Sequence, residues 1–166
     1  AAAVGALLRT LAPADAPIVS SPLGRAHATA RIIAQAAGLT GEVTLDPRLA
    51  EISLGGWDGL LISEVEALRP ALDGRQPPAD WHMRSPDGET YAAFAARLGD
   101  WLAEARERTQ PQIVVSHGVA GRVIRGLYAN LDRNEALTLP VPQDAVWRLA
   151  EGRIERTEHR LKLAPW

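Results

Sequence analysis

Hydrophobic residues recur at helical spacing in several parts of the chain. Apolar positions three or four residues apart predict a helix over Pro22–Ala37, and Gly38 marks its end. The same spacing predicts a helix over Tyr91–Ala105, with charged residues on its other faces. A shorter helix is predicted to begin at Ser63, where Glu66 completes a capping box.

Short apolar runs rich in β-branched residues alternate with these helices. Ile18–Ser21 and Gln112–Ser116 are too short for surface helices, and the second is typical of a buried parallel strand that leads into another helix. Near the C-terminus, Ala145–Leu149 and Arg153–Thr157 flank a Glu-Gly turn and predict an antiparallel hairpin at one edge of the sheet. The alternation of strands and helices predicts an α/β fold with a mostly parallel central sheet flanked by helices.

Composition is that of one globular domain over residues 1–166, since 46% of the residues are hydrophobic and 23% are charged. Eighteen basic side chains against twenty acidic ones leave no broad basic surface, so a nucleic acid partner is not expected. A small anionic substrate needs only a local pocket. No run approaches the roughly 20 apolar residues that cross a bilayer, and no membrane partner is expected.

Cysteine is absent, which excludes disulfides and thiolate chemistry and fits a cytoplasmic protein. The four histidines show no ligand spacing, so we expect neither a bound metal nor a cofactor. The apolar opening Ala1–Leu8 lacks the flanks of a signal peptide and is typical of the end of a helix.

Two predicted strand-to-helix junctions carry polar side chains suited to one bound anion. In the first, Ser21 is placed to cap a helix that begins at Pro22, and Arg25 adds a planar fork for two phosphate oxygens. In the second, His117 and Gly118 follow a buried strand, where open α/β sheets hold ligands. Gly118 is expected to be a tight-turn residue or a backbone donor. These junctions predict a phosphate site.

Residues 69–88 form a long connection rich in proline, glycine and aspartate. Loops of this length are often lids, so Trp81, His82 and Arg84 could face a substrate. A surface excursion without a role at the site is the alternative, and the sequence leaves this point open.

Four motifs follow one another along the chain: SSPLGRAHATARIIA, DPRLAEISLGGWDG, PDGETYAAFAARL and VVSHGVAGRVIRGL. In this order they resemble the motifs of the histidine phosphatase superfamily, also called phosphoglycerate mutase-like proteins. The resemblance spans nearly the whole chain and implies a three-layer sandwich. It implies that Arg25 binds phosphate, that Glu51 is the proton donor and that His117 is the second active-site histidine. Ser21 and Gly118 lie beside them as further candidate phosphate ligands.

One motif of the family does not occur in this sequence. The family carries an Arg-His-Gly triplet at the end of its first, central strand, and its histidine is the nucleophile. His27, His82 and His159 lack the surroundings to replace it. Loss of a central strand would leave backbone groups unpaired, so we expect an amino-terminal segment beyond this sequence, with Ala1–Leu11 as the remainder of the first helix.

The resemblance implies a phosphomonoester hydrolase that acts through a phosphohistidine on a small phosphorylated metabolite. To act as the proton donor, Glu51 would need burial or a neighbouring carboxylate that keeps it protonated near neutral pH. Phosphoglycerate mutase-type transfer is one alternative, and an inactive phosphate-binding protein is another if the chain begins at Ala1. An esterase built on Ser116, Asp144 and His159 would need glycine two residues before the serine, where Val114 stands. A sheet edge or the hairpin could support a homodimer.

Overall fold

The computed structural model describes residues 1–68, 80–83, 85–142 and 145–158. At its centre lie three parallel strands in the order β2-β1-β3, namely β2 (Val43–Leu45), β1 (Ile18–Ser20) and β3 (Ile113–Val115). Ile18 aligns with Val43 on one side and with Ile113 on the other. All three residues of β1 are buried, as expected of a parallel strand covered on both faces.

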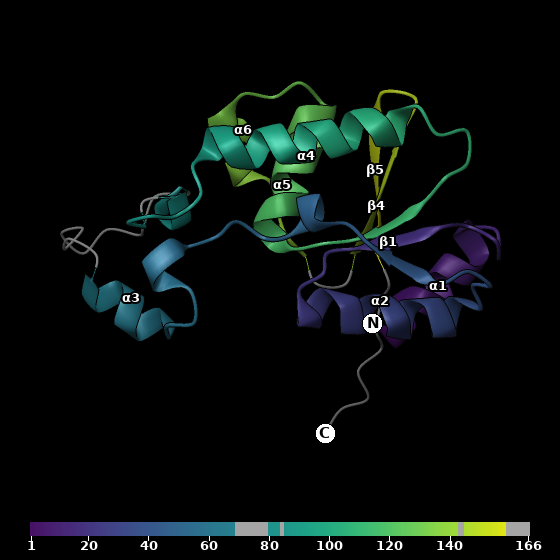
Figure 1. The fold of residues 1–166 in the computed structure, drawn as a ribbon. Coiled ribbons are helices and arrows are strands. Elements are labelled where there is room, and N and C mark those ends of the chain that lie inside the picture. The colour runs from purple at the N-terminus through teal and green to yellow at the C-terminus, as the bar shows by residue number, and fades with distance from the viewer. Residues whose placement is uncertain (69–79, 84, 143–144, 159–166) are drawn as a thin grey trace.

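Helices α1 (Ala2–Leu11) and α2 (Gly24–Ala37) cover one face of this sheet (Figure 1). They approach closely at Gly5, where a Cβ atom would lie 2.6 Å from the Cβ of Ala36. Gly38 ends α2 in the left-handed region, with a φ of 72°, as predicted. Their apolar stripes pack on the side chains of Ile18, Ile113 and Val115.

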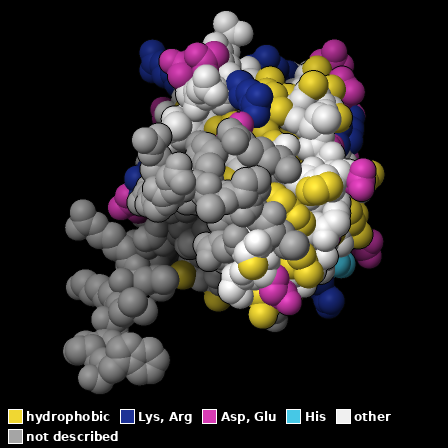
Figure 2. Space-filling view, turned by 90° about the vertical axis from the view of Figure 1, so that its left-hand side faces the viewer, with side chains coloured by type: hydrophobic (Ala, Val, Ile, Leu, Met, Phe, Trp, Pro, Cys, Tyr) yellow, Lys and Arg dark blue, Asp and Glu magenta, His cyan; other side chains and the backbone are white. Residues whose placement is uncertain are grey.

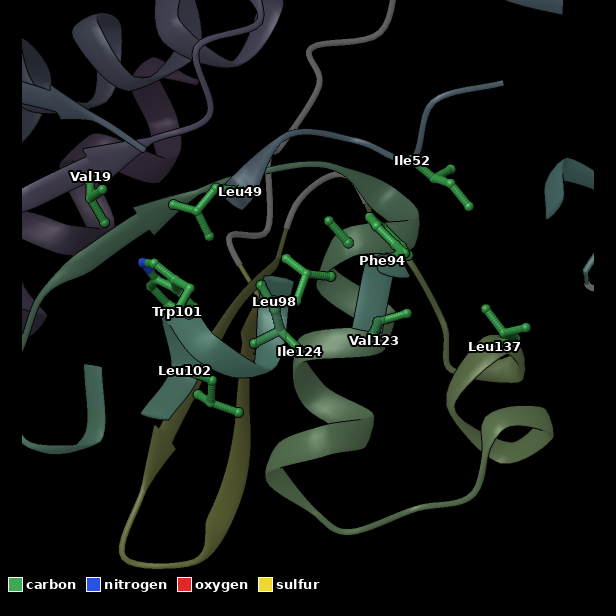
Figure 3. Packing of buried hydrophobic residues seen from close by; sticks show 11 residues of the cluster. Val19, Leu49, Ile52, Phe94, Leu98, Trp101, Leu102, Val123, Ile124 and Leu137 are labelled. Carbon is green, nitrogen blue, oxygen red and sulfur yellow. The ribbon is translucent and has the colours of Figure 1, made fainter. Parts of the chain in front are cut away.

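Helices α4 (Tyr91–Arg106), α5 (Gly118–Tyr128) and α6 (Arg133–Thr138) lie on the opposite face. Figure 3 shows the core beneath them, to which the sheet and the helices both contribute. Its buried members include Val19, Leu49, Ile52, Phe94, Leu98, Trp101, Leu102, Val123, Ile124 and Leu137. Two helical layers around a parallel sheet form the expected three-layer α/β sandwich.

Four short elements connect the layers: η1 (Pro47–Leu49), η2 (Gly55–Trp57), α3 (Ile62–Leu68) and η3 (Trp81–Met83). In Figure 1, α3 projects to the side of the three layers.

The C-terminal hairpin consists of β4 (Ala145–Ala150) and β5 (Arg153–Glu158). Glu151 and Gly152 form its turn with φ angles of 53° and 74°. The hairpin is antiparallel as predicted, but within the described residues it forms a sheet of its own and is not hydrogen-bonded to the edge of the central sheet.

Two helix starts differ from the sequence prediction. Helix α2 begins at Gly24 with Leu23 as its N-cap, so Ser21 is not the cap and Pro22 is not the first helical residue. Ser21 instead continues the sheet, since its N–H donates to the carbonyl of Val115. Helix α3 begins at Ile62, one residue before Ser63. The N–H of Leu61, the residue before the helix, donates to the side chain of Glu64, so the predicted capping pair of Ser63 and Glu66 is not the one that forms.

Most of the predicted lid, residues 69–79 together with Arg84, lies outside the described residues. In the part that the structure describes, no helix combines the length and apolar character needed to cross a membrane. On the face shown in Figure 2, the Lys and Arg side chains of the described residues do not gather into one broad patch, and Asp and Glu side chains lie among them.

Candidate functional site

The ends of two neighbouring parallel strands bring Ser21 and His117 together. Ser21 directly follows β1 with its side chain fully buried, and His117 is the N-cap residue of α5, two residues after β3. The Nε2 atom of His117 is hydrogen-bonded to Ser21 Oγ at 2.8 Å, and the same oxygen accepts from the N–H of Leu23 at 3.2 Å. Ser21 thus fixes one nitrogen of the ring, while Nδ1 has no partner among the described residues.

Burial favours the neutral form of His117. Burial lowers the pKa of His117 from its ordinary value of 6.5, and Arg25 and Arg97 lower it further, whereas Glu51 raises it. A neutral imidazole keeps one donor and one acceptor nitrogen, so the ring can donate one hydrogen bond to an anion.

Glu51 lies across the start of α5. Its two carboxylate oxygens accept from the N–H groups of Val119 at 3.1 Å and Ala120 at 3.0 Å, which are otherwise unpaired at the first turn of a helix. The N–H of Gly118 has no acceptor within the described part of the chain. Gly118 therefore presents a free backbone N–H between His117 and Glu51, and its use as a phosphate donor stays a prediction.

Arg97 on α4 holds the segment that carries Glu51. Its Nη1 donates to the carbonyl oxygens of Arg48 at 2.6 Å and Ala50 at 2.9 Å, and its Nη2 donates to that of Glu51 at 3.2 Å. Glu89 binds the other edge of the guanidinium through both carboxylate oxygens, at 2.7 and 2.8 Å. Sequence reasoning missed this role, although both charged residues lie in the motif PDGETYAAFAARL.

Arg25 lies in the first turn of α2 with an exposed side chain. Its guanidinium makes no ion pair with any residue that the structure describes, so all its donors are available to a ligand. An arginine without a protein partner beside a helix start is well placed to bind an anion.

One cleft of about 1750 Å³ joins these side chains, since Arg25, Glu51, His117 and Gly118 all line it. Ser21 does not line it but is hydrogen-bonded to His117, which does. The cleft continues between β3 and β4 and has walls from α1, α4 and α5. Its volume exceeds the roughly 300–1,000 Å³ of a usual small-molecule pocket, so a small phosphate ester alone would fill only part of it.

One edge of β3 faces this cleft and has no strand partner among the described residues. Ile113 and Val115 direct their backbone groups to β1, since Ile113 N–H donates to Pro17 and the Val115 carbonyl accepts from Ser21. Alternate residues of a parallel strand bond to opposite sides, so Val114 directs its N–H and carbonyl into the cleft.

The structure gives less support to the esterase triad that was considered from the sequence. Ser116 Oγ donates to the carbonyl of Leu49 at 2.8 Å, whereas Asp144 and His159, the other members of the considered esterase triad, lie outside the described residues. Across the described ranges, no three His, Cys, Asp or Glu side chains gather as a metal site requires.

Comparison with known sequences finds one family model, described as histidine phosphatase superfamily (branch 1), that matches residues 1–163. A protein of Erwinia tasmaniensis named "Probable phosphoglycerate mutase GpmB" is 34% identical over 161 residues, which cover 90% of this chain and 65% of the relative. Phosphoserine phosphatase 1 of Hydrogenobacter thermophilus is 37% identical over 109 residues, or 64% of this chain and 51% of the relative. The chain thus spans between about half and two thirds of the length of these relatives.

Two solved structures share the fold. Bacillus stearothermophilus YhfR superposes with a TM-score of 0.71 at 23% identity and covers 95% of this chain and 79% of its own. A mycobacterial glucosyl-3-phosphoglycerate phosphatase in complex with inorganic phosphate gives a TM-score of 0.66 at 26% identity, over 95% of this chain and 81% of the other.

Proposed function

Because this chain belongs to the histidine phosphatase superfamily (branch 1), we propose that it hydrolyses phosphomonoesters of small metabolites through a phosphohistidine intermediate. The observation that carries this proposal is that Arg25, Glu51 and His117 line one cleft. A guanidinium, an imidazole and a carboxyl group that share a ligand can bind a phosphate dianion and exchange a proton with its ester oxygen.

The nucleophile in this proposal is a histidine other than the four of residues 1–166, carried by an additional strand in the cleft between β3 and β4. Three features support this placement: the separate sheets, the backbone groups of Val114 that face the cleft, and a volume larger than a small ester needs. A strand there would join the sheets and end beside Arg25 and His117.

Phosphoryl transfer would then proceed in two steps. In the first, a nitrogen of the nucleophilic histidine forms a bond to phosphorus while the ester P–O bond breaks, and Glu51 gives its proton to the leaving alcohol. In the second, Glu51 takes a proton from water, the water oxygen attacks phosphorus, the P–N bond breaks and inorganic phosphate leaves. Arg25, His117 and the Gly118 N–H stabilise the phosphoryl oxygens throughout.

The names of similar proteins are consistent with this reaction class. One solved neighbour is a phosphatase that binds inorganic phosphate, and one relative is a phosphoserine phosphatase. We propose the cytoplasm as the location, because the sequence contains no cysteine that an oxidising compartment would pair.

The test replaces His117 by alanine in the protein with its natural amino terminus and measures turnover of p-nitrophenyl phosphate. We expect a loss of about 100-fold or more, the usual effect of removing one donor to a reacting oxyanion. Wild-type protein denatured during turnover of an ester radiolabelled at phosphorus should carry the label covalently. Acid should release this label and alkali should not, as expected of a phosphohistidine. Unchanged turnover in the His117→Ala protein would refute the site.

The second candidate is phosphoglycerate mutase-type transfer, favoured by the 34% identity with a protein of that name. A mutase returns the phosphoryl group to substrate instead of to water, so 3-phosphoglycerate would yield its 2-isomer rather than inorganic phosphate. An inactive phosphate-binding protein would bind inorganic phosphate and turn over neither compound.

A further inference from the structure

Residues 139–142 join α6 to β4 and pass the first turn of α5. At the far end of α5, the hydroxyl of Tyr128 accepts from the N–H of Gly152 in the turn of the hairpin at 3.0 Å. Since β4 runs toward that turn, β4 begins nearer the start of α5. His117 and Gly118 lie at this start. The 139–142 segment is therefore close to the proposed phosphate site.

Two arginines of α5 hold the 139–142 segment against the helix. The Nε atom of Arg122 donates to the carbonyl of Leu139 at 2.6 Å. The Nη2 atom of Arg125 donates to the carbonyl of Pro140 at 2.7 Å. Arg125 is buried, and its guanidinium also lies 4.2 Å from the centre of an indole ring on β4. Hydrogen bonds from a charged donor are the strong ones, so these bonds fix the segment to α5.

Val141 contacts the first turn of α5 from this segment. A Cβ atom at Gly118 would lie 3.4 Å from Cγ1 of Val141, which is van der Waals contact. The Cα–Cβ bonds of a helix tilt toward its N-terminus, and the free N–H groups of the first turn point the same way. The methyl group of Val141 therefore lies beside the free N–H of Gly118. Both residues line the cleft together with Arg25 and His117.

The phosphoryl group of a monoester carries three oxygen atoms without a carbon substituent. In the proposed function, Arg25, His117 and the N–H of Gly118 bind these oxygens. A diester carries a second carbon group on one of them, and at the Gly118 oxygen this group would meet the methyl group of Val141. Resting on the proposed function, we infer that Val141 is a specificity-determining residue that closes the cleft at the phosphoryl group and excludes phosphodiesters.

Valine suits this position by its shape and by its chemistry. A β-branched side chain is stiff at χ1, so the methyl group stays in place beside Gly118. It also offers no hydrogen bond to water, so Val141 shields the bound phosphoryl oxygen from solvent on that side. A hydrogen bond is electrostatically stronger where water is excluded. The same side chain thus limits the size of the group and strengthens its binding.

The experiment compares p-nitrophenyl phosphate with methyl p-nitrophenyl phosphate in the protein with its natural amino terminus. The two esters share their leaving group and differ by one methyl group on a phosphoryl oxygen, so their products are inorganic phosphate and methyl phosphate. Val141→Ala should raise kcat/KM for the methyl ester about tenfold, the lower end of what one methylene group decides in a pocket. The charge difference between the esters is the same in both proteins, so the change in preference reports the space at Val141.

Val141→Thr is the matched control for size, because threonine has the shape of valine. It should keep the wild-type ratio of the two kcat/KM values. Val43→Ala on β2 should also keep this ratio, since Val43 does not line the cleft. Val141→Ser, which is close to alanine in size, should act like the alanine variant and serves also if that variant does not fold.

A Val141→Ala protein that hydrolyses the methyl ester no faster than wild type would overturn the inference. A threonine variant that acts like the alanine variant would do the same, as would a wild-type protein that hydrolyses both esters equally well. Turnover of p-nitrophenyl phosphate by wild type separates the two proposals. If that turnover is present, each of these outcomes removes the role of Val141 alone. A wild-type protein that hydrolyses neither ester would overturn the proposed function and this inference with it.

Discussion

The Nε2 atom of His117 and the Oγ atom of Ser21 are 2.8 Å apart, so a hydrogen bond links the residues that follow two adjacent parallel strands. The bond fixes the ring plane of His117 at the cleft. Ser21 is buried and does not line the cleft, so in this structure its contribution is to orient the histidine.

Replacing Ser21 by alanine should therefore weaken phosphate binding without unfolding the protein. The lost hydrogen bond is worth about 1 kcal/mol, so the inhibition constant of inorganic phosphate should rise about fivefold. Ser20→Ala is the matched control, since the buried hydroxyl of Ser20 donates to the carbonyl of Ser21 and does not contact His117. Equal effects of both substitutions would show that the His117 bond has no particular role.

Glu51→Gln should reduce turnover most for substrates whose alcohol is a poor leaving group. The amide oxygen can still accept from the N–H of Val119 or Ala120, so the start of α5 is preserved, but the side chain can no longer donate an acidic proton. The measurement compares kcat/KM for p-nitrophenyl phosphate with that for an alkyl phosphate. A uniform loss across both would contradict the role of Glu51 as the acid.

Arg97→Lys should lower both stability and turnover. A lysine cannot bind the two oxygens of Glu89 and the three carbonyls on the Glu51 segment at once, so several charge-assisted bonds are lost, each worth about 1.5–3 kcal/mol. Urea denaturation and kcat measure the two effects. Arg106→Lys on the same helix, whose side chain is exposed and donates to the carbonyl of Tyr128, should change neither.

Gly55→Ala should destabilise the attachment of residues 85–89 to the Glu51 segment. Gly55 has a φ of +53°, and a Cβ atom there would lie 2.5 Å from the backbone of Pro86 and Asp87. The backbone conformation alone costs about 1–2 kcal/mol for a residue other than glycine. Thermal unfolding measures this loss, and Gly56→Ala is the control because a Cβ atom at Gly56 meets nothing within 4 Å.

Stability should fall as the pH is lowered from about 7.5 to about 5.5. Burial lowers the pKa values of His82 and His117 in the folded protein, so the unfolded chain binds more protons below the ordinary value of 6.5. The free energy of unfolding is therefore highest above that pH and decreases until the folded histidines also become protonated. Urea midpoints should follow this trend, with a shallower slope in His82→Phe. A flat profile would contradict it.

The sequence was most informative where local pattern and topology agree. The alternation of strands and helices predicted the sandwich, and the parallel strands then required the residues after β1 and β3 to meet at one edge. That geometry brings Arg25, His117 and Gly118 to one cleft. Their roles in binding and catalysis stay predictions until activity is measured.

Long-range contacts account for what the sequence could not predict. The partners of Arg97 on the Glu51 segment lie 46 to 49 residues away in the chain, and periodicity placed Arg97 only on a polar face of its helix. The predicted start of α2 was wrong because the prediction assumed that Ser21 caps the helix. Its hydroxyl instead binds His117, 96 residues away, which no local pattern reveals.

The edge of β3 that has no strand partner within the described part of the chain also has a consequence for handling the protein. An open strand edge with backbone donors and acceptors recruits strands from neighbouring molecules. A preparation of residues 1–166 alone should therefore self-assemble through this edge as its concentration rises, and light scattering would detect the growth. An extended peptide supplied in excess to occupy the edge should suppress that assembly.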